Sequence, residues 1–230
     1  MWLMRRVPYV TGGSVIGLKF NGGVAIASDM LGSYGATKRY KAVERIRSAG
    51  QYSAIGASGE MGDYHYISRL LTELETTDFV HEDGVSMGPH ETFSFIQRVM
   101  YNRRSRLNPL WNSIVVGGID PTTGESELGL VGMIGESYRD DHVATGFAQQ
   151  LARPLLREKH SPNMAEADAR ALLHECLRVL FYRDKNSINK FQIATVTASR
   201  GYELSEPFAL NTTWSFKRFH NPAEHLPGTW

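Results

Sequence analysis

The chain has 230 residues, a formal net charge of +1 at pH 7 and one cysteine. A chain of this length can bury enough surface to form one large domain, and it needs no disulfide or metal to stabilise it. The balanced charge argues against a dedicated nucleic-acid-binding domain, and the single cysteine excludes a disulfide framework and a cysteine-rich zinc site.

The N-terminal segment, residues 1–10, begins with apolar residues and two arginines. It lacks the apolar core and small-residue cleavage site of a signal peptide. No stretch approaches the roughly 18 apolar residues of a membrane-spanning helix. We therefore expect a soluble intracellular protein without a membrane partner.

The next part of the chain has the pattern of strands. Residues 14–20 alternate between apolar and polar, residues 23–28 are small and apolar, and the Asn-Gly pair between them is typical of a tight hairpin turn. Residues 40–47 alternate weakly, and residues 52–57 have the composition of a buried strand. We predict that the domain opens with several hairpin-linked strands.

Two helices are predicted next. Apolar residues recur at helical spacing from about residue 63 to 79 and again after Pro89, which suits a first helical turn. Arg103, Arg104 and Arg106 crowd the end of the second helix, where cations suit the helix dipole.

The order of strands followed by a pair of helices then repeats. Residues 111–117 and 127–134 are predicted strands joined by a turn at 120–124, with a short third strand at 142–144. A helix over 147–159, broken near Pro154, precedes a helix over 164–183 with a capping-box-like start at Asn163 and Glu166. A final hairpin is predicted from residues 191–197 and 201–208.

Strands therefore alternate in groups with pairs of helices, which argues against the simple strand-helix alternation of a parallel sheet. Hairpin-linked strands predict antiparallel sheets. The economical arrangement is an α+β fold, a four-layer α/β/β/α sandwich with two antiparallel sheets between two helical layers.

Several motifs resemble catalytic or binding signatures but lack the spacing that these require. Glycine follows Ser58 directly, so the segment lacks the Gly-x-Ser-x-Gly spacing of a nucleophile elbow, and a tight turn is the simpler interpretation. The glycine pairs lack the Lys-Ser/Thr of a phosphate loop, and the eight histidines have no metal-ligand spacing. Cys176 lies on an apolar helical stripe and is interpreted as a structural thiol. No cofactor is implied.

The tail after residue 208 mixes aromatic residues with basic residues and prolines, and it is too short to form its own core. Its aromatic residues are Trp214, Phe216, Phe219 and Trp230. The tail either packs on its own domain or docks on a partner. Its charges are too few to favour single-stranded nucleic acid.

Four segments together resemble the beta-type subunits of the proteasome. They are residues 23–29, residues 32–35, residues 56–60 and the Tyr-Arg-Asp-x-x-Ser run at 182–187. The resemblance covers residues 13–208 in the predicted order of elements. It implies the N-terminal-nucleophile hydrolase fold, which agrees with the sandwich predicted from periodicity.

One branch of that family matches best. Residues 29–35, 103–112, 152–158 and 191–197 are similar to the beta-7 branch, also called beta type-4. The resemblance divides the chain into a leader or propeptide remnant at 1–12, the beta-type domain at 13–208 and an inter-subunit arm at 209–230.

Catalytic members of the family attack the peptide bond with an N-terminal threonine whose freed α-amine acts as base. Aligned without gaps backwards from Asp29, the position of that threonine falls on Gly13. Aligned through Ser33 and Tyr34 onward, the position of the neighbouring lysine falls on Ala42. Asp29, Thr145, Asp184 and Ser187 match the remaining site positions. We therefore expect a non-catalytic subunit, with these residues in structural roles; the alternative is a threonine endopeptidase that uses Thr11 after cleavage of the leader.

The resemblance also implies partners and a compartment. The chain would complete the beta ring between beta-6 and beta-1, contact the alpha ring, and reach the opposite beta ring through its tail, with Trp214, Phe216, Phe219 and Trp230 as anchors. Its setting would be ubiquitin-linked and ATP-linked proteolysis in cytoplasm and nucleus. Neither nucleic acid nor membrane is expected as a partner.

Overall fold

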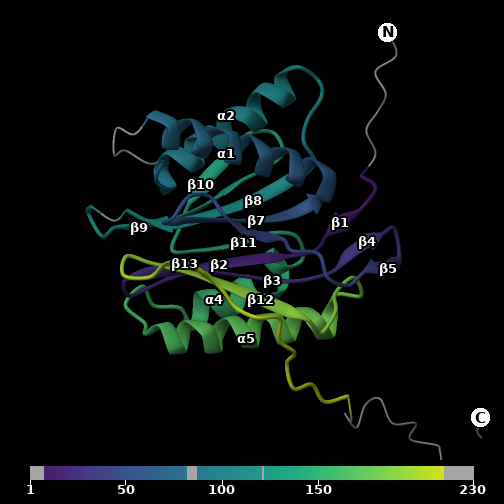
Figure 1. The fold of residues 1–230 in the computed structure, drawn as a ribbon. Coiled ribbons are helices and arrows are strands. Elements are labelled where there is room, and N and C mark those ends of the chain that lie inside the picture. The colour runs from purple at the N-terminus through teal and green to yellow at the C-terminus, as the bar shows by residue number, and fades with distance from the viewer. Residues whose placement is uncertain (1–7, 82–86, 121, 215–230) are drawn as a thin grey trace, which may run out of the picture.

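Two antiparallel sheets lie face to face and are covered on their outer sides by helices (Figure 1). This arrangement confirms the predicted α+β sandwich of four layers. The computed structural model describes residues 8–81, 87–120 and 122–214. Within them, no helix is long and apolar enough to cross a membrane.

The first sheet has the order β10-β9-β8-β7-β1-β4-β5, and β6 also pairs with β7. Its strands are β1 (Thr11–Gly12), β4 (Gly32–Tyr34), β5 (Thr37–Tyr40), β6 (Ile46–Ser48), β7 (Ser53–Glu60), β8 (Asn112–Ile119), β9 (Ser126–Val131) and β10 (Ser137–Arg139). The short strand β1 therefore joins the hairpin of β4 and β5 to the rest of the sheet.

The second sheet has the order β11-β2-β3-β12-β13. Its strands are β2 (Val15–Phe20), β3 (Gly23–Asp29), β11 (His142–Ala144), β12 (Phe191–Thr197) and β13 (Gly201–Leu204). The predicted hairpin between β2 and β3 is confirmed, and Gly22 adopts a φ of 83° that a residue with a side chain rarely takes.

Helices α1 (Met61–His81) and α2 (Pro89–Ser105) cover the first sheet, and α3 (Ala148–Leu151), α4 (Arg153–Lys159) and α5 (Glu166–Arg183) cover the second. Three clusters of buried apolar side chains fill the spaces between the layers. One lies under each helical layer and the third lies between the sheets. Burial on both faces explains why the central strands β3 and β12 are buried along their whole length.

Some local predictions were wrong. Residues 40–47 do not form one strand, because β5 ends at Tyr40 and β6 begins only at Ile46. The N-cap of α5 is Ala165, without a side-chain cap bond, so Asn163 does not form the predicted capping box. The break near Pro154 is confirmed, since α4 begins at Arg153 and places the proline in its first turn.

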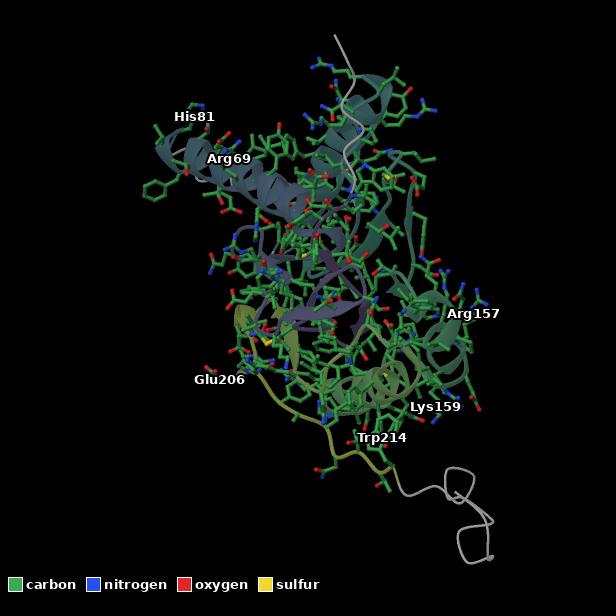
Figure 2. The ribbon with its side chains drawn as sticks, turned by 90° about the vertical axis from the view of Figure 1, so that its right-hand side faces the viewer. Arg69, His81, Arg157, Lys159, Glu206 and Trp214 are labelled. Atoms are coloured by element: carbon green, nitrogen blue, oxygen red, sulfur yellow. The ribbon has the colours of Figure 1, made fainter. Side chains whose placement is uncertain are left out.

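The tail is described as far as Trp214. The Trp214 ring lies edge-on to the rings of Tyr182 and Phe181, at 5.0 and 5.9 Å, and the Thr213 amide donates a hydrogen bond to the Tyr182 hydroxyl. Figure 2 shows Trp214 at the end of the molecule opposite Arg69 and His81 of α1. The start of the tail thus packs on its own domain, while Phe216, Phe219 and Trp230 lie outside the described residues.

Candidate functional site

The end of β3 and the loop after α5 meet beside Gly13, which lies between β1 and the buried start of β2 at Val15. A Cβ atom added to Gly13 would lie 3.8 Å from a carboxylate oxygen of Asp29 and 3.8 Å from one of Asp184. It would lie 3.4 Å from the carbonyl oxygen of Asn186. The structure therefore brings two of the residues predicted from the sequence, Asp29 and Asp184, to the predicted position Gly13, which carries no side chain.

The loop after α5 is held by hydrogen bonds from its own residues. The Asn186 amide donates to Asp184 Oδ1 at 2.8 Å, and the Ser187 hydroxyl donates to the Asp184 carbonyl oxygen at 2.8 Å. Asp184 and Ser187 are both buried. Their polar groups therefore shape the loop that carries Asp184 to Gly13.

Asp29 is paired with Arg45, a residue that the sequence analysis did not identify. Both side chains are buried, and the Arg45 guanidinium forms an ion pair with Asp29 Oδ1. Arg45 Nε also donates to the Asp29 carbonyl oxygen at 2.9 Å. Burial raises the pKa of the Asp29 carboxyl, and the guanidinium beside it opposes that rise.

Arg45 also binds the backbone of the site. Its Nη1 donates to the Gly13 carbonyl oxygen at 2.9 Å, and its Nη2 donates to the Ser14 carbonyl oxygen at 3.1 Å. One guanidinium therefore links the end of β3 to the residues that lead into β2. Its planar fork of five N–H donors suits this task better than the single ammonium of lysine would.

The structure does not bring Ala42 to this site. Ala42 is exposed in the segment between β5 and β6, and the cation beside Asp29 is Arg45. The placement at Ala42 came from the alignment carried on through Ser33 and Tyr34. In the structure the chain turns inward after β5, where the Val43 amide donates to the Met30 carbonyl oxygen, and the buried cation is Arg45. The only sequence signal for Arg45 was indirect, because a buried aspartate needs a nearby cation and several were available.

Thr145, which follows β11, contacts the start of β2 near Gly13. The Val15 amide donates to Thr145 Oγ1 at 2.9 Å, and the Ala148 amide donates to Ser14 Oγ at 3.1 Å. These bonds tie the junction of β11 and α3 to the start of β2. Thr145 is fully buried, and its hydroxyl is already used in this structural contact.

The residues before Gly13 form a strand that is paired on both sides. In β1, Thr11 lies opposite Ser33 of β4 and Glu60 of β7, and the Val10 carbonyl oxygen accepts a hydrogen bond from the Met61 amide. A Cβ atom on Gly12 would come within 2.5 Å of Arg45 Cδ. Only glycine fits there, so the close approach of Arg45 depends on Gly12.

An open cleft of about 500 Å³ lies against these residues. Its lining includes Thr11, Gly13 and Asp184, with the aromatic side chains of Trp111 and Phe147 on other parts of its wall. Trp111 and Phe147 are both exposed. Among the described residues, no group of three or more His, Cys, Asp or Glu side chains could hold a metal ion.

The other motifs have structural explanations. Ser58 lies near the end of β7 and donates to the Ser113 carbonyl oxygen at 3.2 Å. Cys176 is fully buried in α5, and burial raises the pKa of its thiol to about 12. A thiol with so high a pKa is a poor nucleophile at neutral pH.

Comparison with known proteins gives one consistent result. A model of the proteasome subunit family matches residues 9–196. The chain is 50% identical to proteasome subunit beta type-4 of Arabidopsis thaliana, over 97% of this chain and 89% of the relative. It is 44% identical to beta type-4 of Xenopus laevis, over 90% and 85%, and 36% identical to beta type-7 of Saccharomyces cerevisiae, over 92% and 83%.

Proposed function

Because the chain belongs to the proteasome subunit family, we propose that it is a non-catalytic, structural beta subunit of the 20S core particle. It completes the beta ring and supports assembly and stability of the particle in ubiquitin-linked and ATP-linked proteolysis. The names of its relatives, beta type-4 and beta type-7, support this placement within the family.

The observation that carries the proposal is the geometry at Gly13. Attack on a peptide bond needs a hydroxyl or thiol and a base that activates it. Gly13 lies between the carboxylates of Asp29 and Asp184, where a side chain could reach both, but it supplies neither group. The site retains the charged surroundings of a nucleophile without the nucleophile.

The retained residues then have a different task. Arg45 uses its donors on Asp29 and on the carbonyl groups of Gly13 and Ser14. A guanidinium engaged in this way holds three segments of backbone in place. We assign the cluster to positioning β1, β2 and β3 relative to one another.

The partners follow from membership of the family. The chain assembles with other proteasome subunits; in the proposal its ring neighbours are beta-6 and beta-1, and it also contacts the alpha ring. Residues 209–230 form the arm to the opposite beta ring, residues 1–12 are the leader, and the particle works in cytoplasm and nucleus. Trp214 packs on Tyr182 and Phe181 but is still 54% exposed, so part of its ring is available to a partner, which supports the proposed arm.

A threonine peptidase that uses Thr11 is the second candidate. Thr11 lines the cleft together with Gly13, which favours it. However, Thr11 is paired on both sides in β1, and cleavage before it would remove the Val10 carbonyl group that accepts the Met61 amide. The two proposals predict different mature N-termini: the peptidase requires a chain that begins at Thr11, and the non-catalytic subunit does not.

The test is intact-mass and N-terminal analysis of the chain from native particles, before and after treatment with a covalent threonine-directed inhibitor. We expect an N-terminus other than Thr11 and no adduct on this chain, while the catalytic subunits of the same particles provide the positive control. A chain that begins at Thr11 and carries the inhibitor would overturn the non-catalytic assignment.

Sedimentation tests the assignment to the particle. The chain should migrate with the core particle in a cell extract, and a chain found only as a monomer would contradict the proposal. Deletion of residues 211–230 should weaken the joining of half-particles and leave the fold intact. Unchanged joining would remove the role of the arm without affecting the rest of the proposal.

A further inference from the structure

The β4–β5 hairpin presents a free strand edge. Among the strands that the structure describes, β5 is the terminal strand of the first sheet and pairs with β4 alone, and all four of its residues are exposed. Figure 1 shows the hairpin at the margin of the molecule beside β1. The outer edge of β5 therefore offers backbone N–H and C=O groups to another strand.

The edge is strongly basic. Lys38, Arg39 and Lys41 fall within four consecutive positions, and Lys185 lies in the loop that the hairpin contacts. Within the described ranges, none of these four cations forms an ion pair. The chain as a whole has a net charge of +1, so this local excess is distinct from its average composition.

Aromatic contacts make the edge a preformed surface. Arg39 lies over the rings of Tyr34 and Tyr40, at 5.9 and 5.7 Å from their centroids, and Tyr9 packs on Tyr34 at 4.6 Å. Lys38 Nζ donates to the Ser187 carbonyl oxygen at 2.7 Å. A partner that binds here would therefore order few additional groups on this side of the interface.

The charge selects the partner. A second copy of this chain would bring the same three cations against this edge, and like charges on paired strands repel. An extended segment rich in Asp and Glu would gain both backbone pairing and opposite charge. Nucleic acid would use the cations and rings but not the backbone groups of the edge.

We propose that β5 is a docking edge for an extended acidic segment of another protein subunit, which adds to the first sheet as a further strand. Lys41 and Arg39 bind carboxylates of that segment, and the exposed tyrosines 34 and 40 cover its apolar parts. The inference names a partner chemistry for the assembly proposed above and therefore rests on that function.

The test is photo-crosslinking in the native particle, with p-benzoylphenylalanine in place of Tyr40. The expected product joins this chain to a segment of another subunit that contains several Asp or Glu residues. Crosslinks to nucleic acid, to a second copy of this chain or to a segment without acidic residues would each overturn the inference, as would a particle that yields no crosslink.

Charge reversal gives the second measurement. The double variant Arg39→Glu with Lys41→Glu should reduce recovery of the crosslinked partner at least tenfold, whereas Arg39→Lys with Lys41→Arg keeps the charge and should retain it. Equal recovery with both variants would contradict the inference. If the chain is absent from the particle, the proposed function fails; if it is present without the acidic crosslink, only this inference fails.

Discussion

Two arginines six positions apart in the chain, Arg39 and Arg45, have opposite surroundings. Arg45 is fully buried and uses its guanidinium on Asp29 and on the backbone of Gly13 and Ser14. Arg39 is exposed on the sheet edge and stacks on two tyrosines without an ion pair among the described residues. The comparison shows that the same side chain can be an internal support or an available surface, depending on where the backbone turns inward.

The difference should be measurable as free energy of unfolding. A buried cation whose acidic partner is also buried cannot be removed without leaving an uncompensated charge. An exposed cation is solvated in the folded and unfolded chain alike, so its removal changes the free energy of unfolding little. The variants below test this contrast, from the largest expected effect to the smallest.

Arg45→Met should lower the free energy of unfolding by about 3–5 kcal/mol, because Asp29 would remain buried without its cation. Urea titration followed by circular dichroism would measure the change. The control is Arg47→Met, an exposed arginine two positions away, which should stay within about 0.5 kcal/mol of the parent chain.

The Arg45 result can be sharpened with Asp29→Asn. The double variant Arg45→Met with Asp29→Asn should lose clearly less free energy of unfolding than the two single variants together. In the double variant no buried charge is left without a partner. Strict additivity in this cycle would show that the buried ion pair is not the source of the loss.

Gly12→Ala should lower the free energy of unfolding by about 1–3 kcal/mol, since its Cβ would come within 2.5 Å of Arg45 Cδ and 2.9 Å of Met61 Cε. Gly13→Ala is the matched control. Its Cβ has nothing closer than 3.4 Å, so we expect a change within about 1 kcal/mol. Thermal unfolding of both variants would compare them, and equal losses would contradict the close packing of Arg45 on β1.

Lys38→Met should cost about 0.5–1.5 kcal/mol, because it removes the hydrogen bond from Nζ to the Ser187 carbonyl oxygen. Lys41 lies on the same exposed segment and makes no such bond in the described structure. The change Lys41→Met should therefore leave the free energy of unfolding almost unchanged. Chemical denaturation of the two variants under identical conditions would separate the anchored lysine from the free one. A larger loss of free energy of unfolding for Lys41→Met than for Lys38→Met would contradict the view that Lys38 is the anchored lysine.

The double variant Arg39→Glu with Lys41→Glu should change the free energy of unfolding by no more than about 1 kcal/mol. Neither cation forms an ion pair in the described structure, and only the exposed stacking of Arg39 on two tyrosines is lost. Thermal melts at low and high salt would show nearly the same small change. A loss comparable to that of Arg45→Met would mean that the edge supports the fold instead of presenting a surface.

The predicted elements were mostly correct where a local pattern decides the structure. The Asn-Gly turn between β2 and β3, the helical period of α1 and α2, and the break near Pro154 all follow from residues close in sequence. The cap at Asn163 was wrong because a short polar motif can form elsewhere than at the first residue of a helix. β10 was not predicted, since a strand of three residues, two of them exposed, is too short to show a period of two.

The sequence by itself determined the order of strands and helices, the likeness to a family, and the lack of a side chain at Gly13. These depend on local periodicity, on turn chemistry and on residue identity. Only the tertiary structure decided that Arg45 lies against Asp29 instead of Ala42, and that β1 fills the space between β4 and β7. Those contacts join residues distant along the chain, and which segments meet is set by how the two sheets and the irregular segment before β6 pack together.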